Sequence, residues 1–224
     1  MIIINTNIFE TIKFKDAKKI KLMARNEYKC IVTNEKIIKE FIESLSENYY
    51  LMLKHNNYNR NYTNLYFDNE NMDILKAHDN HNNIRQKIRI RKYEKDKVLE
   101  IKTKENGYTT KVRCKYNDKL ETNQKWIENN FIYNADKLIP VIKNSYDRIT
   151  FISKDKSERI TIDSNLSFFN YITNKSYHEN NLFFIIEIKT ENIENSKINN
   201  ILQNLDIEIT KFSKYYYGIN KTNI

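Results

Sequence analysis

Glycine and proline are scarce in this sequence, which has two glycines and one proline in 224 residues. Glycine-rich loops that hold phosphates with their backbone need several glycines for tight turns and close approach. The scarcity of glycine therefore excludes a P-loop or a dinucleotide-binding fingerprint, so side chains would have to bind any phosphate. Linker-like stretches rich in proline, glycine or serine are absent too, and we predict a single domain over residues 1–224.

Cysteine and long apolar runs are also limited. The two cysteines, Cys30 and Cys114, are too few for a disulfide framework or a zinc site, and the prediction is a reducing, cytoplasmic location. No apolar run approaches the roughly 18–20 residues that a membrane span needs. The N-terminal segment lacks the leading basic residues and the cleavage site of a signal peptide, so no such peptide is expected.

Positive charge, by contrast, is abundant. The net charge is +9 and the isoelectric point is about 9.2, while 40% of the residues are hydrophobic and 30% are charged. This composition is typical of a globular protein. The charge indicates an anionic partner. The candidate classes are nucleic acid, a phosphorylated small molecule, polyphosphate and a membrane surface.

The most informative segment runs from Arg85 to Arg91, where four cations occupy every second position. A period of two is the strand period, so these cations point to one face of a sheet while Ile88 and Ile90 point to the other. Same-face neighbours lie roughly 6.5–7 Å apart, and each like-charged pair costs on the order of 2 kcal/mol at an effective dielectric constant of about 20. Three such pairs rival the stability of a whole domain, typically about 5–15 kcal/mol. This face is therefore either bathed in water or built to hold a polyanion.

The same alternation recurs along the chain. Charged and polar side chains share faces in four further sets: Glu100, Lys102 and Lys104; Lys111, Arg113 and Lys115; Arg159, Thr161 and Asp163; Glu187 and Lys189. Isoleucine and leucine occupy the opposite face of most of these segments. The pattern predicts an α+β fold of about eight antiparallel strands, in which a β-barrel has a cation-lined lumen and helices packed outside.

Local patterns place the individual elements. Expected strands cover residues 24–32, 62–68, 84–93, 97–104, 108–116, 142–153, 158–164 and 182–190. Expected helices cover residues 34–48, 71–79, 121–138 and 195–206, and Asn34 is the expected N-cap of the first. His78 and His81 lie in a polar segment and are expected at the surface, whereas Cys30 and Cys114 are expected to be inert packing residues.

Eight short motifs occur in one order along the chain: Arg25-x-Glu27-x-Lys29, Tyr66-Phe67-Asp68, Lys87-Ile-Arg89-Ile-Arg91, Leu99-Glu-Ile-Lys102, Tyr146-Asp-Arg148, Arg159-Ile-Thr161-Ile-Asp163, Glu187-Ile-Lys189 and Ser213-Lys214-Tyr215. In these motifs the chain resembles the VTC domain, the catalytic domain of polyphosphate polymerases, which belongs to the triphosphate tunnel metalloenzyme superfamily. The resemblance covers about residues 20–220. It implies an eight-stranded antiparallel tunnel with lysine and arginine for phosphates and acidic residues for a divalent metal, Mn²⁺ or Mg²⁺.

The resemblance also implies an activity and a set of site residues. Family members transfer the terminal phosphate of ATP to a growing polyphosphate chain, so ATP and inorganic polyphosphate are the expected partners. The implied catalytic residues are Arg89, Arg91, Lys29 and Arg159, and the implied phosphate-binding residues are Lys102, Lys111, Arg148, Lys189 and Lys214. Glu187 matches the main metal-binding carboxylate, and Glu27 is the second acidic residue.

Two alternative functions stay open at this point. Position 25 is arginine where the hydrolase and cyclase branch of the superfamily has glutamate, which favours the polymerase-like branch. A tunnel triphosphatase that hydrolyses tripolyphosphate or a nucleoside triphosphate would nevertheless use the same walls and metal. A non-enzymatic nucleic-acid or polyanion-binding module is the other alternative. Because the cationic strands alternate with aliphatic rather than aromatic residues, base-stacking platforms are missing and no nucleic-acid partner is expected.

Overall fold

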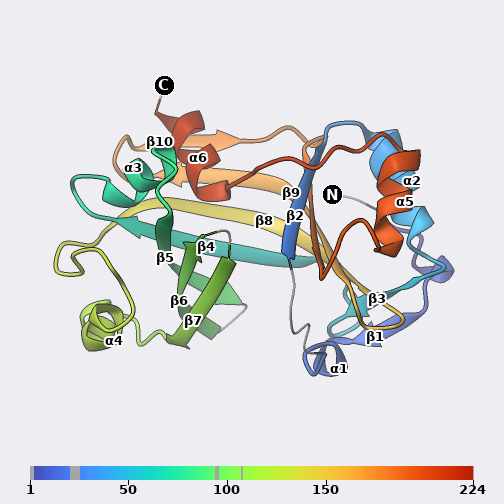
Figure 1. Cartoon of the computed structure of the whole chain (residues 1–224), viewed down its shortest axis with the longest axis horizontal. Helices are drawn as coiled ribbons and strands as arrows, with labels where there is room; N and C mark the ends of the chain where they lie inside the picture. The colour runs from blue at the N-terminus through green and yellow to red at the C-terminus, as the bar shows by residue number, and fades with distance from the viewer. Residues whose placement is uncertain (1–2, 21–25, 94–95, 107, 224) are drawn as a thin grey trace. The chain divides into compact units, whose positions relative to one another are not determined.

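The structure is a computed structural model of the 224-residue chain, and it describes residues 3–20, 26–93, 96–106 and 108–223 (Figure 1). It is an α+β fold dominated by antiparallel strands, as the alternation predicts. The chain forms two compact units that are interleaved in sequence. No helix within the described ranges is long and apolar enough to cross a membrane.

Unit 1 comprises Met1–Arg60, Tyr146–Leu166 and Glu179–Phe212. Its strands are β1 (Thr11–Lys13), β2 (Asn26–Val32), β3 (Tyr49–Leu53), β11 (Phe184–Thr190) and the adjoining parts of β8 (Ile139–Ser153) and β9 (Arg159–Asn170). Its helices are η1 (Thr6–Ile8), α1 (Phe14–Ala17), α2 (Glu35–Ser44) and α5 (Lys197–Asn204). The strand order is β2-β11-β9-β8, and β3 joins β8 while pairing in parallel with β1.

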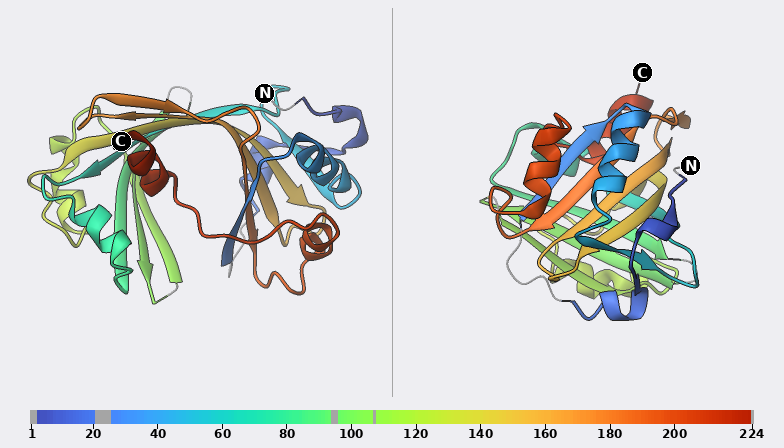
Figure 2. Two further views of the ribbon diagram at one scale, coloured as in Figure 1. Left: turned by 90° about the horizontal axis from the view of Figure 1, so that it is seen from above. Right: turned by 90° about the vertical axis from the view of Figure 1, so that its right-hand side faces the viewer.

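The core of unit 1 follows from the period-two pattern. The apolar positions of β2, β9 and β11 form one cluster with the inner faces of α2 and α5, including Cys30, Ile160, Ile186, Phe41 and Leu202. Figure 2 shows α2 and α5 beside these strands. The side chain of Asn34 accepts hydrogen bonds from the backbone N–H groups of residues 36 and 37, which confirms it as the N-cap of α2.

Unit 2 comprises Asn61–Ser145, Ser167–His178 and Ser213–Ile224. Its strands are β4 (Arg60–Asp68, all but the first residue), β5 (Ile84–Tyr93), β6 (Asp96–Glu105), β7 (Tyr108–Lys115), β10 (Lys175–His178) and the remaining parts of β8 and β9. Its helices are α3 (Asp73–Asp79), η2 (Glu121–Asn123), α4 (Gln124–Glu128) and α6 (Lys214–Thr222). The strand order is β8-β4-β5-β6-β7, and β10 pairs with β9. The hydrogen-bonded order β2-β11-β9-β8-β4-β5-β6-β7 contains eight of the described strands.

Three expectations from the sequence need correction. The helix expected over residues 121–138 is confined to η2 and α4, and the chain is irregular from residue 129 to 138. Asparagines compete there for backbone groups, because Asn130 Nδ2 donates to the carbonyl of Trp126 and Asn134 Oδ1 accepts from the N–H of Asp136. The strand expected over residues 158–164 continues to Asn170. The strands β1, β3 and β10 were not expected.

The C-terminal helix α6 was not expected either, and buried polar contacts hold it within unit 2. Tyr215 donates its hydroxyl to Asp68 Oδ2 at 2.7 Å, and Asn170 Nδ2 donates to Thr222 Oγ1 at 2.9 Å. Between these contacts the helix packs through Gly218, where an added Cβ would lie 2.3 Å from Cδ1 of Phe168. The helix can therefore approach β9 closely only because it has no side chain at this position.

We expect Gly218→Ala to lower the free energy of unfolding by about 1–3 kcal/mol, because the new methyl group overpacks the contact with Phe168. The loss should appear even though alanine is the better helix former by about 1 kcal/mol. Urea denaturation measures the change. Asn220→Ala is the control, since Asn220 is exposed on the same helix and its replacement should leave stability unchanged or slightly higher. Equal loss in both variants would refute the packing explanation.

Candidate phosphate-binding and metal-binding site

Unit 1 gathers charged side chains on one face of strands β2, β11 and β9. Directly opposite residues in antiparallel strands share a face. The register forms two neighbouring rows, Lys29–Glu187–Thr161 and Glu27–Lys189–Arg159. Five residues that the resemblance selected therefore lie together on this face.

Opposite charges lie next to each other at Lys29–Glu187 and at Glu27–Lys189, whereas Lys189 and Arg159 are neighbours of like charge. Lys189 forms an ion pair with Glu187, and its Nζ also lies 4.0 Å from Glu27 Oε2. Lys29 Nζ lies 3.3 Å from Glu27 Oε1 and donates a 2.8 Å hydrogen bond to the carbonyl of Phe212. Both lysines are thus held in place by carboxylates on the same face.

A buried arginine completes this cluster. Arg148 Nε donates to Asp163 Oδ1 at 2.5 Å, and its Nη2 donates to Asp163 Oδ2 at 2.6 Å and lies 3.5 Å from Glu187 Oε2. Burial acts to lower the pKa of Arg148, but the carboxylate of Asp163 raises it well above its ordinary value. Burial acts to raise the pKa of Glu187, but Lys189, Arg148 and Lys29 together hold it well below its usual range. Arg148 and Glu187 are therefore both charged at neutral pH.

Glu27 and Glu187 are the carboxylates that the resemblance assigns to a metal, and both lie beside the ammonium group of Lys189. In the described part of the chain, no three or more His, Cys, Asp and Glu side chains come together to hold a metal ion. Magnesium is commonly bound by one or two carboxylates, with water and substrate phosphates supplying the other oxygens. The two carboxylates fit an ion of this kind that binds together with a phosphate ligand.

Unit 2 carries a second charged face, which is strongly cationic. Two rows of opposite residues cross β4 to β7: Tyr66–Arg89–Glu100–Arg113 and Asn64–Arg91–Val98–Lys115. Two shorter rows cross β5 to β7: Lys87–Lys102–Lys111 and Arg85–Lys104–Thr109. The predicted site residues Arg89, Arg91, Lys102 and Lys111 all lie here. The opposite face carries buried aliphatic residues such as Ile88, Leu99 and Ile101.

The buried carboxylate of Glu100 interacts with several of the cations around it. Its Oε1 accepts from Nε and Nη2 of Arg89, its Oε2 accepts from Arg113 Nε at 2.8 Å, and Lys111 Nζ lies 3.7 Å away. Arg89 Nη1 also donates to the hydroxyl of Tyr66 at 2.8 Å. Burial acts to raise the pKa of Glu100, but Arg89, Arg91 and the cations of β7 lower it far below its ordinary value. Glu100 is therefore an anion with a fixed set of cationic partners.

Neutral groups hold the other central arginine. Arg91 Nε donates to Asn64 Oδ1 at 2.8 Å, and Asn64 Nδ2 donates to Asn144 Oδ1 at 2.8 Å. Arg91 Nη1 donates to the hydroxyl of Tyr93 at 3.2 Å. The guanidinium group of Arg91 is therefore buried and is oriented by an amide and a phenol.

The last predicted phosphate ligand, Lys214, comes from a helix and not from a strand. It is the first residue of α6 and follows the N-cap Ser213, whose hydroxyl also accepts a 2.7 Å hydrogen bond from Lys87 Nζ. Lys87 Nζ lies 5.7 Å from the ring centre of Tyr215. The start of α6 thus contacts the cationic face of unit 2 through Lys87.

Several residues of these faces were not selected from the sequence. Glu100, Arg113 and Thr161 fit the alternation of the sequence, but one sequence does not give the register that sets which residues lie opposite them. His78, expected at the surface, is half buried and stacks on Tyr216 with ring centres 4.8 Å apart. Burial, followed by the nearby cations, lowers its pKa to about 4. Arg25 of the first motif lies outside the described residues.

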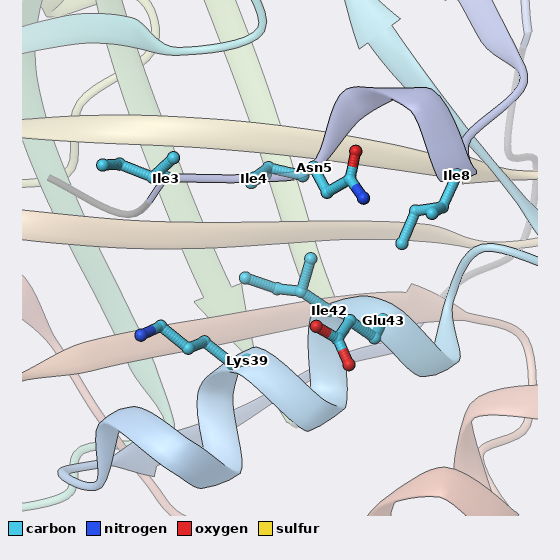
Figure 3. Close-up of a pocket in the computed structure, with 7 residues that line it drawn as sticks. All are labelled: Ile3, Ile4, Asn5, Ile8, Lys39, Ile42 and Glu43. Atoms are coloured by element: carbon cyan, nitrogen blue, oxygen red, sulfur yellow. The ribbon is translucent and has the colours of Figure 1, made fainter.

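The pocket in Figure 3 lies in unit 1, away from the charged rows. The N-terminal segment and α2 line it with Ile3, Ile4, Asn5, Ile8, Lys39, Ile42 and Glu43. Its lining is mostly aliphatic and includes one lysine, so it does not have the chemistry of a polyphosphate site.

Comparisons with known proteins agree with this fold. The family model of the VTC domain matches residues 24–223. A search of curated protein sequences gave no match. Among solved structures, HpAC1 from Hippeastrum, described as revealing a dominant triphosphatase activity, has a TM-score of 0.58 at 14% identity, over 89% of this chain and 97% of its own.

Two further solved structures show the same fold. PH1819 from Pyrococcus horikoshii OT3 has a TM-score of 0.54 at 15% identity, over 88% of this chain and 99% of its own. A candidate adenylate cyclase from Bacillus halodurans has a TM-score of 0.55 at 14% identity, over 85% of this chain and 96% of its own. At these sequence identities the likeness establishes the fold. The reaction has to be inferred from the residues of the site.

We expect Glu100→Gln to lower the free energy of unfolding by about 3 kcal/mol, because it leaves Arg89 and its cationic neighbours without their buried counter-ion. Urea denaturation at pH 7 and low salt measures this loss. Glu105→Gln is the matched control, since Glu105 is an exposed glutamate on the same strand and its replacement should cost almost nothing. A Glu100→Gln variant as stable as the wild type would contradict the assigned role.

The stability of the wild-type protein should also fall steeply in acid. The pKa of Glu100 in the folded state lies below the value of about 4.3 in an unfolded chain, so the unfolded state takes up the proton first. The contribution of Glu100 is therefore complete above about pH 5 and is lost as the pH falls through 4 and below. Denaturation midpoints measured from pH 6 to pH 3 should decline less steeply for Glu100→Gln than for the wild type. Parallel declines would show that Glu100 is not the titrating group.

Proposed function

The chain belongs to the VTC domain family, and on that premise we propose that it is a metal-dependent phosphotransferase that adds the γ-phosphate of ATP to a growing polyphosphate chain. The observation that carries the proposal is the alternation of Glu187 with Lys29, Lys189 and Arg148 on one sheet face of unit 1. Cations and carboxylates placed together in this way suit a substrate that carries both phosphate charge and a metal ion. ATP and inorganic polyphosphate are the proposed partners.

Positioning and charge neutralisation are the main demands of phosphoryl transfer, which needs little covalent chemistry from the protein. We assign Lys29, Lys189 and Arg159 in unit 1 to phosphate oxygens, together with Arg148. In unit 2, Arg89 and Arg91 are held in fixed orientations by Glu100 and Asn64. Guanidinium groups that are oriented in advance stabilise developing charge without reorganising during the reaction.

The remaining cations of unit 2 are also assigned to phosphate binding. Lys102 and Lys111 lie opposite each other in the register, and Lys87 continues their row. Three ammonium groups in one row make a surface for a linear polyanion with many phosphates. Lys214, at the start of α6, is assigned to phosphate binding with them.

Glu187 and Glu27 are assigned to a divalent cation, Mn²⁺ or Mg²⁺. When bound with the nucleotide, such an ion would neutralise phosphate charge and orient the transferred group. The chain's own contribution is to place two carboxylates together and to hold that of Glu187 ionised at neutral pH, which its low pKa supports. Lys189, now paired with Glu187, would be released to a phosphate oxygen when a cation takes its place.

A triphosphatase that hydrolyses tripolyphosphate or a nucleoside triphosphate is the second candidate. It is favoured by the structural likeness to HpAC1, which is described as having a dominant triphosphatase activity. The two reactions differ only in the acceptor, which is a polyphosphate end in one and water in the other. The same cations and carboxylates would serve both.

Product analysis decides between these candidates. Purified protein incubated with ATP and Mn²⁺ should yield ADP and a long-chain polymer with internal phosphate signals in ³¹P NMR. Orthophosphate as the only new phosphate species would establish the triphosphatase instead. Lack of turnover with either metal, combined with salt-sensitive RNA binding, would overturn both and favour a polyanion-binding module.

We expect Lys29→Ala to lower kcat/KM by about 10²–10³ without unfolding the protein, because it removes one oriented cation from the phosphate site. Its ion pair with Glu27 is partly exposed, so the cost to stability should stay below about 1 kcal/mol. Lys97→Ala is the control, because Lys97 pairs with Asp118 at the surface of unit 2. Equal turnover in Lys29→Ala and Lys97→Ala would remove Lys29 from the site.

A further inference from the structure

Thr161 is a buried residue whose hydroxyl lacks a partner. The side chain is on β9 and the residue is only 4% exposed. Its Oγ1 is fully buried and has no hydrogen-bond partner among the described residues. An unpaired hydroxyl in the interior loses its hydrogen bonds to water without replacement, which costs free energy. Valine has nearly the same shape and would avoid this cost, so packing alone does not account for the hydroxyl.

The position of Thr161 puts this hydroxyl on the charged face of unit 1. Thr161 lies directly opposite Glu187 in the register, and Glu187 lies opposite Lys29. Directly opposite side chains have Cβ atoms about 4.5–5.5 Å apart, which brings a threonine oxygen and a glutamate oxygen within reach of one small ion. The neighbouring carboxylate of Asp163 is occupied on both oxygens by Arg148.

The sign of the local charge distinguishes between a cation and a phosphate at this point. The group directly opposite Thr161 is the carboxylate of Glu187, which attracts a cation and repels a phosphate oxygen. A hydroxyl oxygen has lone pairs that act as hard ligands, the kind that Mg²⁺ and Mn²⁺ prefer. The unpartnered oxygen and the anion beside it thus suit the same ligand.

We propose that Thr161 Oγ1 is an oxygen ligand of the divalent cation held by Glu187, directly or through one bound water. The assignment rests on the proposed metal-dependent function and adds a third protein ligand to the two carboxylates. It also accounts for the presence of a hydroxyl at a buried strand position where that hydroxyl has no hydrogen-bond partner in the described part of the chain.

The test compares Thr161→Val with Thr161→Ser in the full-length protein. Mn²⁺ binding is measured from the free-Mn²⁺ signal in electron paramagnetic resonance, with and without a non-hydrolysable ATP analogue. We expect Thr161→Val to weaken Mn²⁺ binding about tenfold, as losses of supporting groups in metal sites commonly do, and Thr161→Ser to stay within about twofold of the wild type. Melting in EDTA should show Thr161→Val to be more stable than the wild type, because the unpaired hydroxyl is gone.

Thr190→Val is the matched control. Thr190 is a buried threonine on the neighbouring strand β11, at a position of the opposite face, so its replacement should leave Mn²⁺ binding unchanged. Unchanged Mn²⁺ binding in Thr161→Val would overturn the assignment. Weaker binding of tripolyphosphate in EDTA, with Mn²⁺ binding unaltered, would also overturn it and make the hydroxyl a phosphate donor. A less stable Thr161→Val protein in EDTA would show that the hydroxyl has a structural partner.

The proposed function can fail separately from this assignment. A wild-type protein that binds Mn²⁺ but forms neither polymer nor orthophosphate from ATP would overturn the proposed function. The contribution of Thr161 to Mn²⁺ binding would still be measured in that case. The comparison of Thr161→Val with Thr161→Ser would decide whether Thr161 is a ligand.

Discussion

Repulsion between like charges on one face of a sheet is the constraint on which the two charged faces depend. The strand β5 places cations at every second position, and the register puts further cations of β6 and β7 opposite some of them. The sequence suggests two ways to tolerate this arrangement, solvation or a bound polyanion. The structure adds a third, because Glu100 is buried among the cations and interacts with at least three of them. One carboxylate therefore both reduces the repulsion and fixes the orientation of Arg89.

Unit 1 meets the same constraint differently. Carboxylates lie among its cations, so that Lys189 lies beside Glu187 and opposite Glu27, and Arg148 is matched by Asp163. Little net charge accumulates on this face, and Lys29, Lys189 and Arg148 each have a carboxylate within a few ångströms. A ligand that enters must therefore replace existing partners, which suits a metal ion and a phosphate that arrive together. Unit 2, with its surplus of cations, suits phosphate alone.

The sequence is informative where a local period decides the outcome. Alternating polar and apolar residues predicted the strands that carry Arg89 and Glu187. Because a strand has only two faces, the same pattern also predicted which face is apolar and is covered by α2. Alternation does not give the register between strands, so the sequence does not show which residues lie opposite Glu100 and Thr161. It also misjudged residues 129–138, where asparagine side chains compete for backbone groups over a helical pattern. Lys214 was selected from a motif, but the helix that presents it depends on tertiary contacts of Tyr215 and Gly218.

The charge surplus of unit 2 has a thermodynamic consequence for any ligand. Lys87, Lys102 and Lys111 are held in one row by backbone pairing, so their repulsion is an energy already present before binding. A polyanion removes that repulsion when it binds, and the free energy released adds to its affinity in proportion to the number of phosphates engaged. A single orthophosphate spans only part of such a row. On the proposed function, we therefore expect this surface to favour long polyphosphates over short ones, without any contact that recognises chain length as such.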